Sequence, residues 1–163
     1  MNQDERSISR DRMRYIKNSA SSRLCYLAIL FNVFYFVSIC KSDVGVYYYN
    51  ILIGGVILYN LFFMLAVFLA SEGVKNYKRD YSFLLLALGV GQILRFFVIP
   101  MHAHSETTVV NGAETLVMRD GQFIRVAIYL AVSAVCLIAA ALINLYKCRE
   151  LSEHQKSLAA QTA

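Results

Sequence analysis

Charged side chains are scarce in this chain, and their scarcity limits the kind of protein it can be. Asp, Glu, Lys and Arg make up 17% of its 163 residues, while hydrophobic residues make up 58%. A globular domain has about a quarter charged and about half apolar residues. A soluble domain of this size would leave roughly a third of the surface of its unfolded chain in water, so it could not bury the excess. The composition argues against a soluble domain and indicates a membrane protein.

Within the longest apolar runs, acidic residues and histidine are absent altogether, and the chain has a single proline. Proton-coupled transporters and cation channels use ionisable residues of these kinds inside the membrane. Transporters with discontinuous helices have central Gly and Pro breaks. The glycine pairs inside the runs, Gly54 with Gly55 and Gly89 with Gly91, have no mid-span proline, and Pro100 lies at the end of a run, where we expect it to stop the helix. These features argue against a proton-coupled antiporter and against a cation channel, and they leave an anion path past Arg95 open.

The residues that would support catalysis or cofactor binding are missing as well. The chain has no glycine-rich phosphate loop, no clustered carboxylates and no nucleophile placed beside a base. Its only histidine pair, His102 and His104, offers too few ligands for a metal site, and its cysteines lack the spacing of a redox or zinc motif. We therefore expect no enzymatic activity, no cofactor and no metal. The basic residues lack interleaved aromatics, so we also expect no nucleic-acid partner.

Four apolar runs carry most of the hydrophobic residues. Each approaches or exceeds the roughly 17 to 25 residues with which a helix crosses a hydrocarbon core of about 30 Å, and each is apolar on all sides. Short connections favour antiparallel neighbours. We predict an all-α integral membrane protein with four transmembrane helices in an up-down-up-down bundle. The predicted spans are residues 24–40, 47–70, 82–99 and 126–146.

The first run follows a basic stretch, as the apolar core of a secretory signal peptide does. Its 17 residues exceed the usual length of about 7 to 15. No cleavage site of small residues follows it, because Ser38, Ile39 and Cys40 lead directly into Lys41. We expect the run to remain in the protein as its first transmembrane helix.

Basic residues are distributed unevenly around the predicted spans. Twelve Lys and Arg residues lie on the side of the two termini and three on the other side, which by the positive-inside rule places both termini in the cytoplasm. We expect the plasma membrane as the location, residues 1–23 as a cytoplasmic N-terminal segment and residues 147–163 as a cytoplasmic tail. Four cations at helical spacing predict an interfacial helix that contacts lipid headgroups and fixes the topology. They are Arg6, Arg10, Arg14 and Lys17.

The connection between the third and fourth spans has a hairpin pattern. Two β-prone tetrads, residues 107–110 and 115–118, flank Asn111 and Gly112, a pair that favours the positive dihedral angles of a tight turn. We predict a small extracellular β-hairpin over residues 105–122, lying over the mouth of the bundle. Isolated hairpins are marginally stable in water, so we expect this one to rest on the helix ends or on another protein.

Polar side chains occur at similar depths in all four spans. Because an amide exposed to lipid is costly, each should face protein, which predicts one polar intramembrane cluster. Two interpretations stay open: a hydrogen-bonded layer that holds the helices together, or the lining of a pocket. For the arginine, we favour the interpretation that its guanidinium rises to the outer interface, roughly 6 Å away, toward phosphate or the carboxylates of Asp43, Glu106 and Asp120. The cluster consists of Asn32, Asn60, Gln92, Arg95 and Ser133.

The fourth span carries mostly small residues at alternating steps of four and three, which form a narrow, smooth seam. Small residues let helix backbones approach closely, and dispersion in that contact drives association in lipid. The seam packs either inside the bundle, which we favour, or on a partner. It consists of Ala127, Ala131, Ala134, Ile138 and Ala141.

These observations favour a non-catalytic accessory or scaffolding subunit of a larger membrane complex such as a transporter. Its expected partners are the lipid bilayer and either another membrane protein or a second copy of the chain. The alternative is an autonomous small oligomeric transporter or channel, in which the polar cluster would line a mid-membrane pocket.

Overall fold

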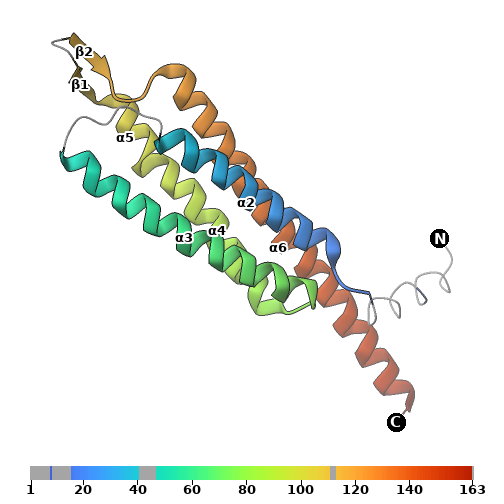
Figure 1. The fold of residues 1–163 in the computed structure, drawn as a ribbon. Helices are drawn as coiled ribbons and strands as arrows, with labels where there is room; N and C mark the ends of the chain where they lie inside the picture. Colours follow the sequence, from blue (N-terminus) through green and yellow to red (C-terminus); the bar gives the residue numbers. More distant parts are fainter. Residues whose placement is uncertain (1–7, 9–15, 41–46, 111–112, 163) are drawn as a thin grey trace.

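The structure is a computed structural model, and it describes residues 8, 16–40, 47–110 and 113–162. Four of its helices are long and apolar enough to cross a membrane, which confirms the four predicted spans at that level. The described elements in chain order are α2 (Ser19–Cys40), α3 (Tyr47–Lys75), α4 (Arg79–Val98), α5 (Pro100–Ser105), β1 (Thr107–Val110), β2 (Ala113–Leu116) and α6 (Asp120–Thr162) (Figure 1).

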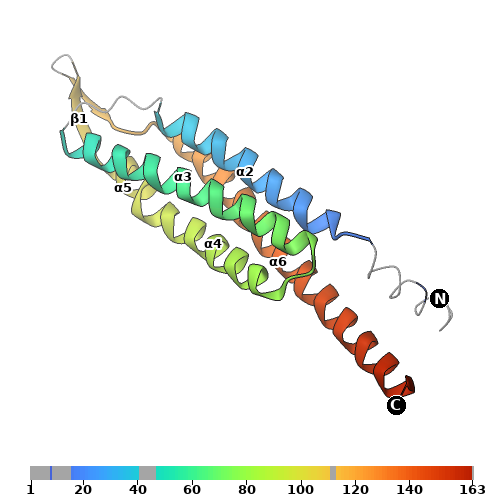
Figure 2. The same cartoon turned by 60° about the horizontal axis from the view of Figure 1, so that its bottom comes forward.

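The long helices lie side by side and alternate in direction along the chain (Figures 1 and 2). Helix α6 packs against α2 and α4, and α3 packs against the same two helices from the other side. Large apolar side chains cover the outward faces of the bundle; Phe62, for example, is 70% exposed and Val98 is 63% exposed. Such a surface is typical of contact with lipid hydrocarbon rather than with water.

Two helices extend well beyond the residues that hydropathy assigned to them. Helix α3 continues to Lys75, and α6 begins at Asp120 and continues to Thr162. Residues 147–162, which we expected as a separate tail, therefore prolong the fourth transmembrane helix. Hydropathy locates the segment that lies in oil, but residues such as Glu, Lys, Gln, Leu and Ala favour a helix in water too.

The third helix, α4, ends at Val98, next to the predicted end before Pro100, and a short helix that was not predicted, α5, begins at the proline itself. Backbone hydrogen bonds continue through this point: Ile99 N donates to Arg95 O at 3.1 Å, and Ala103 N donates to Ile99 O at 2.9 Å. Proline lacks an N–H donor and has a fixed φ, both of which suit the first residue of a new helix. The proline therefore lies at the predicted end of the third helix and also begins the next helical segment.

Strands β1 and β2 pair antiparallel between α5 and α6, with Val110 opposite Ala113. The pair occupies residues 107–116, a shorter stretch than the predicted 105–122, and its turn residues Asn111 and Gly112 lie outside the described part of the chain. Val117 and Met118 were predicted within the second strand, but they follow it and are buried. The burial of these two side chains against the helix ends therefore outweighs the hydrogen bonds that a longer β1–β2 pair would form.

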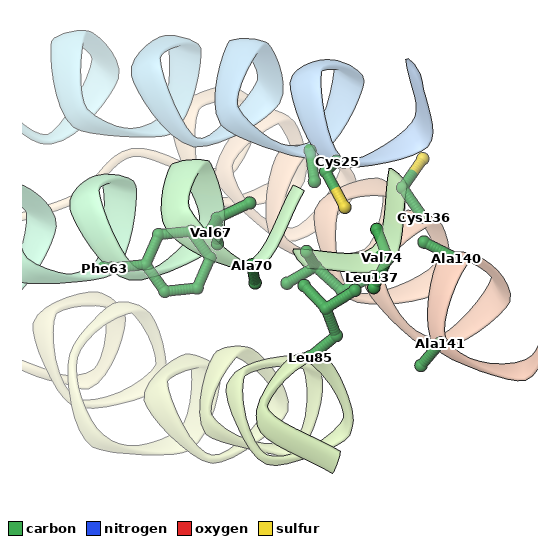
Figure 3. Close-up of a cluster of buried hydrophobic side chains, with 11 residues drawn as sticks. Cys25, Phe63, Val67, Ala70, Val74, Leu85, Cys136, Leu137, Ala140 and Ala141 are labelled. Atoms are coloured by element: carbon green, nitrogen blue, oxygen red, sulfur yellow. The ribbon is translucent and has the colours of Figure 1, made fainter. Parts of the chain in front are cut away.

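The apolar core has two parts. The turn-end cluster lies toward the α3–α4 turn and contains small residues such as Ala28, Ala70 and Ala140, which allow close helix contacts (Figure 3). The hairpin-end cluster lies toward β1 and β2 and includes Tyr35 and Met118.

The α3–α4 turn is closed by a residue in the left-handed region, Tyr77, whose φ is 55°. Lys78 N donates to Gly73 O at 3.1 Å and Tyr77 N donates to Val74 O at 3.1 Å, the two bonds of a Schellman cap. The Tyr77 hydroxyl donates to Ile16 O at 3.1 Å, and burial raises the pKa of this phenol. The turn is thereby tied to the segment that precedes α2.

Candidate functional site

The five polar residues of the predicted intramembrane cluster come together in one layer across the bundle. Helix α2 contributes Asn32, α3 contributes Asn60, α4 contributes Gln92 and Arg95, and α6 contributes Ser133. All five are buried; Arg95, the most exposed, is only 5% exposed. We call these five residues the polar layer.

Asn32 is the centre of the polar layer. Its Nδ2 donates to Oδ1 of Asn60 at 3.0 Å, and its own Oδ1 accepts hydrogen bonds from Gln92 Nε2 at 3.0 Å and from Arg95 Nη1 at 3.3 Å. Arg95 Nη1 also donates to Asn60 Oδ1 at 3.1 Å. One side chain thus links α2 to α3 and to α4.

Ser133 joins the fourth helix to the same layer. Its Oγ accepts a long hydrogen bond from Gln92 Nε2 at 3.4 Å and donates to Ala28 O at 3.1 Å. Asn60 Nδ2 donates to Val56 O at 2.8 Å. The polar layer therefore connects all four membrane-spanning helices through hydrogen bonds among buried groups.

Arg95 does not rise to the outer interface as its position near the helix end suggested. Its guanidinium lies in the polar layer, with its central carbon 4.1 Å from the ring centroid of Tyr35 and 4.6 Å from that of Tyr59. Aromatic faces attract a guanidinium, and the two Asn side chains of the layer offer acceptors. These contacts direct the side chain inward.

Part of this arginine stays without a hydrogen bond. Its Nε and Nη2 atoms, the hydroxyl of Tyr35 and Oε1 of Gln92 are buried and have no partner among the described residues. No carboxylate in the described part of the chain pairs with Arg95. The polar layer thus holds the positively charged guanidinium of Arg95. Its two donors without a hydrogen bond, Nε and Nη2, lie along one edge of this group.

Tyr35 and Tyr59 are site residues that sequence reasoning did not select. Tyrosines in membrane proteins are enriched at the membrane interfaces, so a tyrosine alone does not indicate a buried site. Tyr35 follows Asn32 by three residues, so both fall on one face of α2, and this spacing was the available signal.

A second buried polar network, at the other end of the bundle, was also not predicted. Asn144 Oδ1 accepts from Asn18 Nδ2 at 3.0 Å, and its Nδ2 donates to Ser82 Oγ at 2.7 Å and to Lys78 O at 3.2 Å. Lys147 Nζ donates to Asn18 Oδ1 at 3.0 Å. These bonds fasten the residues before α2 and the start of α4 to α6.

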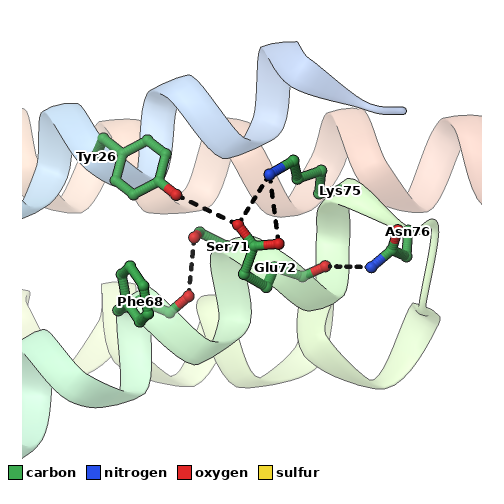
Figure 4. Close-up of polar contacts among 6 residues, drawn as sticks. All are labelled: Tyr26, Phe68, Ser71, Glu72, Lys75 and Asn76. Atoms are coloured by element: carbon green, nitrogen blue, oxygen red, sulfur yellow. Dashed lines mark hydrogen bonds and ion pairs between the residues drawn. The ribbon is translucent and has the colours of Figure 1, made fainter. Parts of the chain in front are cut away.

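Near this end an exposed group of polar contacts surrounds Glu72 (Figure 4). Its carboxylate accepts from Lys75 Nζ at 3.0 Å and from the Tyr26 hydroxyl at 3.4 Å, and its backbone O accepts from Asn76 Nδ2 at 3.0 Å. Exposed ion pairs contribute little, on the order of 0 to 1 kcal/mol. This group therefore holds the helix end but is not a chemical site.

The predicted helix-packing seam is divided between the interior and the surface. Ala134 and Ala141 are buried and Ile138 is half-buried, whereas Ala131 is exposed. Toward the hairpin end, Ala127 and Ala131 line a shallow apolar groove of about 260 Å³ between α4 and α6. One part of the seam thus packs within the bundle and the other part borders its lipid-facing surface.

Gly89 of α4 is the contact point for the inner part of the seam. A Cβ added there would lie 2.9 Å from Ile138 Cγ1 and 3.6 Å from Ala134 O, whereas nothing lies within 4 Å of a Cβ added at Gly55. We expect Gly89→Ala to lower the free energy of unfolding by about 1 to 2 kcal/mol, because α4 and α6 must separate slightly. Thermal unfolding in detergent, followed by far-ultraviolet circular dichroism, measures this, with Gly55→Ala as the tolerated control. Equal stability of the two variants would contradict the contact.

Other predicted positions lie apart from the polar layer. Arg6, Arg10 and Arg14 are outside the described residues, and Lys17 is exposed before α2. His102 Nε2 lies 2.9 Å from Glu106 Oε1, and the described residues contain no group of three or more metal-ligating side chains.

Comparison of the chain with protein-family models, with curated proteins and with solved structures finds no match.

Proposed function

We propose that this protein is a non-catalytic accessory or scaffolding subunit of a larger membrane complex, such as a transporter. The observation that carries the proposal is the polar layer, in which the amides of Asn32, Asn60 and Gln92 hydrogen-bond to neighbouring side chains and are almost completely buried. A conducting path would have polar groups facing water. Amides that bind one another across helices act instead as interhelical contacts, worth about 1 kcal/mol each.

The surfaces outside the bundle support a subunit role. Helix α6 projects beyond the other helices (Figure 2). A cleft of about 760 Å³ between this projection and the start of α4 combines cationic and apolar side chains, among them Arg79, Phe83, Arg149 and Lys156. Such a mixture suits an interface with a polypeptide or with the headgroup region of the bilayer.

A gentle-detergent purification with a C-terminal tag tests the proposal. We expect a defined membrane complex to copurify in stoichiometric amount and to crosslink to the tagged chain in cells. A lone monomer after crosslinking would contradict the proposal. The second candidate, an autonomous small oligomeric transporter or channel, predicts solute flux when the purified protein alone is placed in liposomes.

We further propose that the protein resides in the plasma membrane with both termini in the cytoplasm, as the distribution of Lys and Arg supports. Cys40 is exposed at the hairpin end of α2, and Ser152 is exposed on the projecting part of α6. We expect a membrane-impermeant maleimide to label a Cys40-only variant in intact cells. A cysteine-free variant carrying Ser152→Cys should react only after permeabilisation. Labelling of both variants in intact cells would refute this orientation.

A further inference from the structure

We propose that Arg95 and Tyr35 form an intramembrane binding site for one small monovalent anion, such as a halide, nitrate or a formate-sized carboxylate. This inference goes beyond the accessory role: it uses the same polar layer, but it concerns the donors of Arg95 that the layer leaves without a hydrogen bond.

The positive charge of Arg95 has no counterion among the described residues. Arg95 is 5% exposed, and no carboxylate among the described residues pairs with it. An uncompensated ion in a low-dielectric interior costs several kcal/mol even after the surroundings relax. Asn32, Asn60 and the rings of Tyr35 and Tyr59 supply dipoles and π-electron density but no negative charge. A bound anion would provide a countercharge that the described residues do not.

Two nitrogen donors of the Arg95 guanidinium have no hydrogen bond. Arg95 uses Nη1 for both of its hydrogen bonds to Asn32 and Asn60, which leaves Nε and Nη2 without partners. These two atoms form one edge of the guanidinium, the fork that binds oxyanions with two parallel hydrogen bonds. The hydroxyl of Tyr35 is also unpartnered, and its ring lies 4.1 Å from the same guanidinium. A buried donor without a hydrogen bond costs about 1 to 3 kcal/mol of stability, so an acceptor that bonds to several such donors binds favourably.

The burial and single positive charge of Arg95 limit the size and charge of the ligand. The guanidinium is buried among Tyr35, Tyr59 and the amides of the polar layer, so a ligand with few atoms would displace the fewest neighbouring side chains. The desolvation cost of an ion rises steeply with its charge, and one cation balances one negative charge. We therefore expect chloride, nitrate or formate to bind in preference to divalent sulfate or the larger gluconate. Tyr59 is 38% exposed, so the site approaches the protein surface on the α3 side.

The test compares the stability of the purified full-length protein in sodium chloride, nitrate or formate with that in gluconate or sulfate at one ionic strength. We expect the unfolding temperature to rise saturably, by roughly 3 to 6 °C, with the small monovalent anions only. A larger rise in unfolding temperature with chloride than with formate indicates a halide site, and the reverse order indicates a carboxylate site. Identical curves in all five salts would overturn the proposal.

Variants separate this site from a general salt effect. Tyr35→Phe keeps the ring but removes the hydroxyl, so we expect about tenfold weaker anion binding. Arg95→Gln should abolish the response, while Arg125→Gln, which removes an exposed arginine, should leave it unchanged. An Arg95→Gln protein that keeps the full response would refute the site. Line broadening of chloride-35 resonance by the wild-type protein measures binding without unfolding, and its absence together with flat melting curves would also refute it.

Discussion

Replacing Asn32 by leucine is expected to lower the free energy of unfolding by about 3 to 5 kcal/mol. Asn32 donates to Asn60 and accepts from Gln92 and from the charged Arg95, and all of these groups are buried. Leucine restores volume but removes one acceptor from the buried Arg95 guanidinium and one hydrogen-bond partner each from the amides of Asn60 and Gln92. Unfolding of the purified protein by a denaturing detergent, followed by circular dichroism, measures the loss.

Two variants control this experiment. Asn76→Leu removes one hydrogen bond of an exposed amide, to Glu72 O, so it should cost less than about 1 kcal/mol. Asn32→Asp keeps oxygen acceptors for Gln92 and Arg95 and adds a countercharge beside the guanidinium, so it should retain most of the stability that leucine loses. An Asn32→Leu protein as stable as the wild type would mean that the polar layer does not hold the helices together.

The second large effect is expected at Gly73, in the last turn of α3. The ring of Tyr81 lies directly over this glycine and leaves no space for a Cβ atom. Gly73 O also accepts from Asn76 N at 3.2 Å and from Lys78 N at 3.1 Å, so its backbone is held in the turn. We expect Gly73→Val to cost about 3 kcal/mol or to prevent folding, because neither the turn nor the ring can move freely.

A double-mutant cycle with the smaller substitution identifies the cause. Gly73→Ala should destabilise the protein by about 1 to 3 kcal/mol, and Tyr81→Ala removes the ring that the new methyl group meets. If the clash is responsible, the double variant should be more stable than the sum of the two single losses implies. Strict additivity would show that Gly73 matters for another reason, such as its backbone conformation. Gly55→Ala, with nothing within 4 Å, controls for the substitution itself.

The sequence predicts much of the membrane-spanning architecture because the cost of polar groups in oil is a strong constraint. The apolar runs locate four helices, and the rule that an amide avoids lipid brings Asn32, Asn60, Gln92 and Ser133 into one layer. The rule says nothing about where a long side chain turns. Arg95 could reach either the interface or the core, and the choice depends on the acceptors and rings that neighbouring helices happen to present.

Features set by local backbone chemistry were harder to predict. The continuation of α6 through residues 147–162 depends on helix propensity in water, which hydropathy does not report. The network around Asn144 joins residues of three separate segments, so no local pattern marks it. Tyr77 adopts a left-handed conformation although it is not a glycine. In addition to the local bonds of the cap, its hydroxyl donates to Ile16 O and its carbonyl accepts from Cys148 Sγ, and both partners are far away in the sequence.

The unbroken length of α6 has a mechanical consequence. At 1.5 Å per residue, its 43 residues make a rod of about 65 Å, longer than the 40 to 45 Å thickness of a bilayer with its headgroups. A force applied near Thr162 therefore reaches Asp120, beside β2, without passing through a flexible joint. Tilting the projecting end of α6 would therefore also move its first residues, next to the β1–β2 pair.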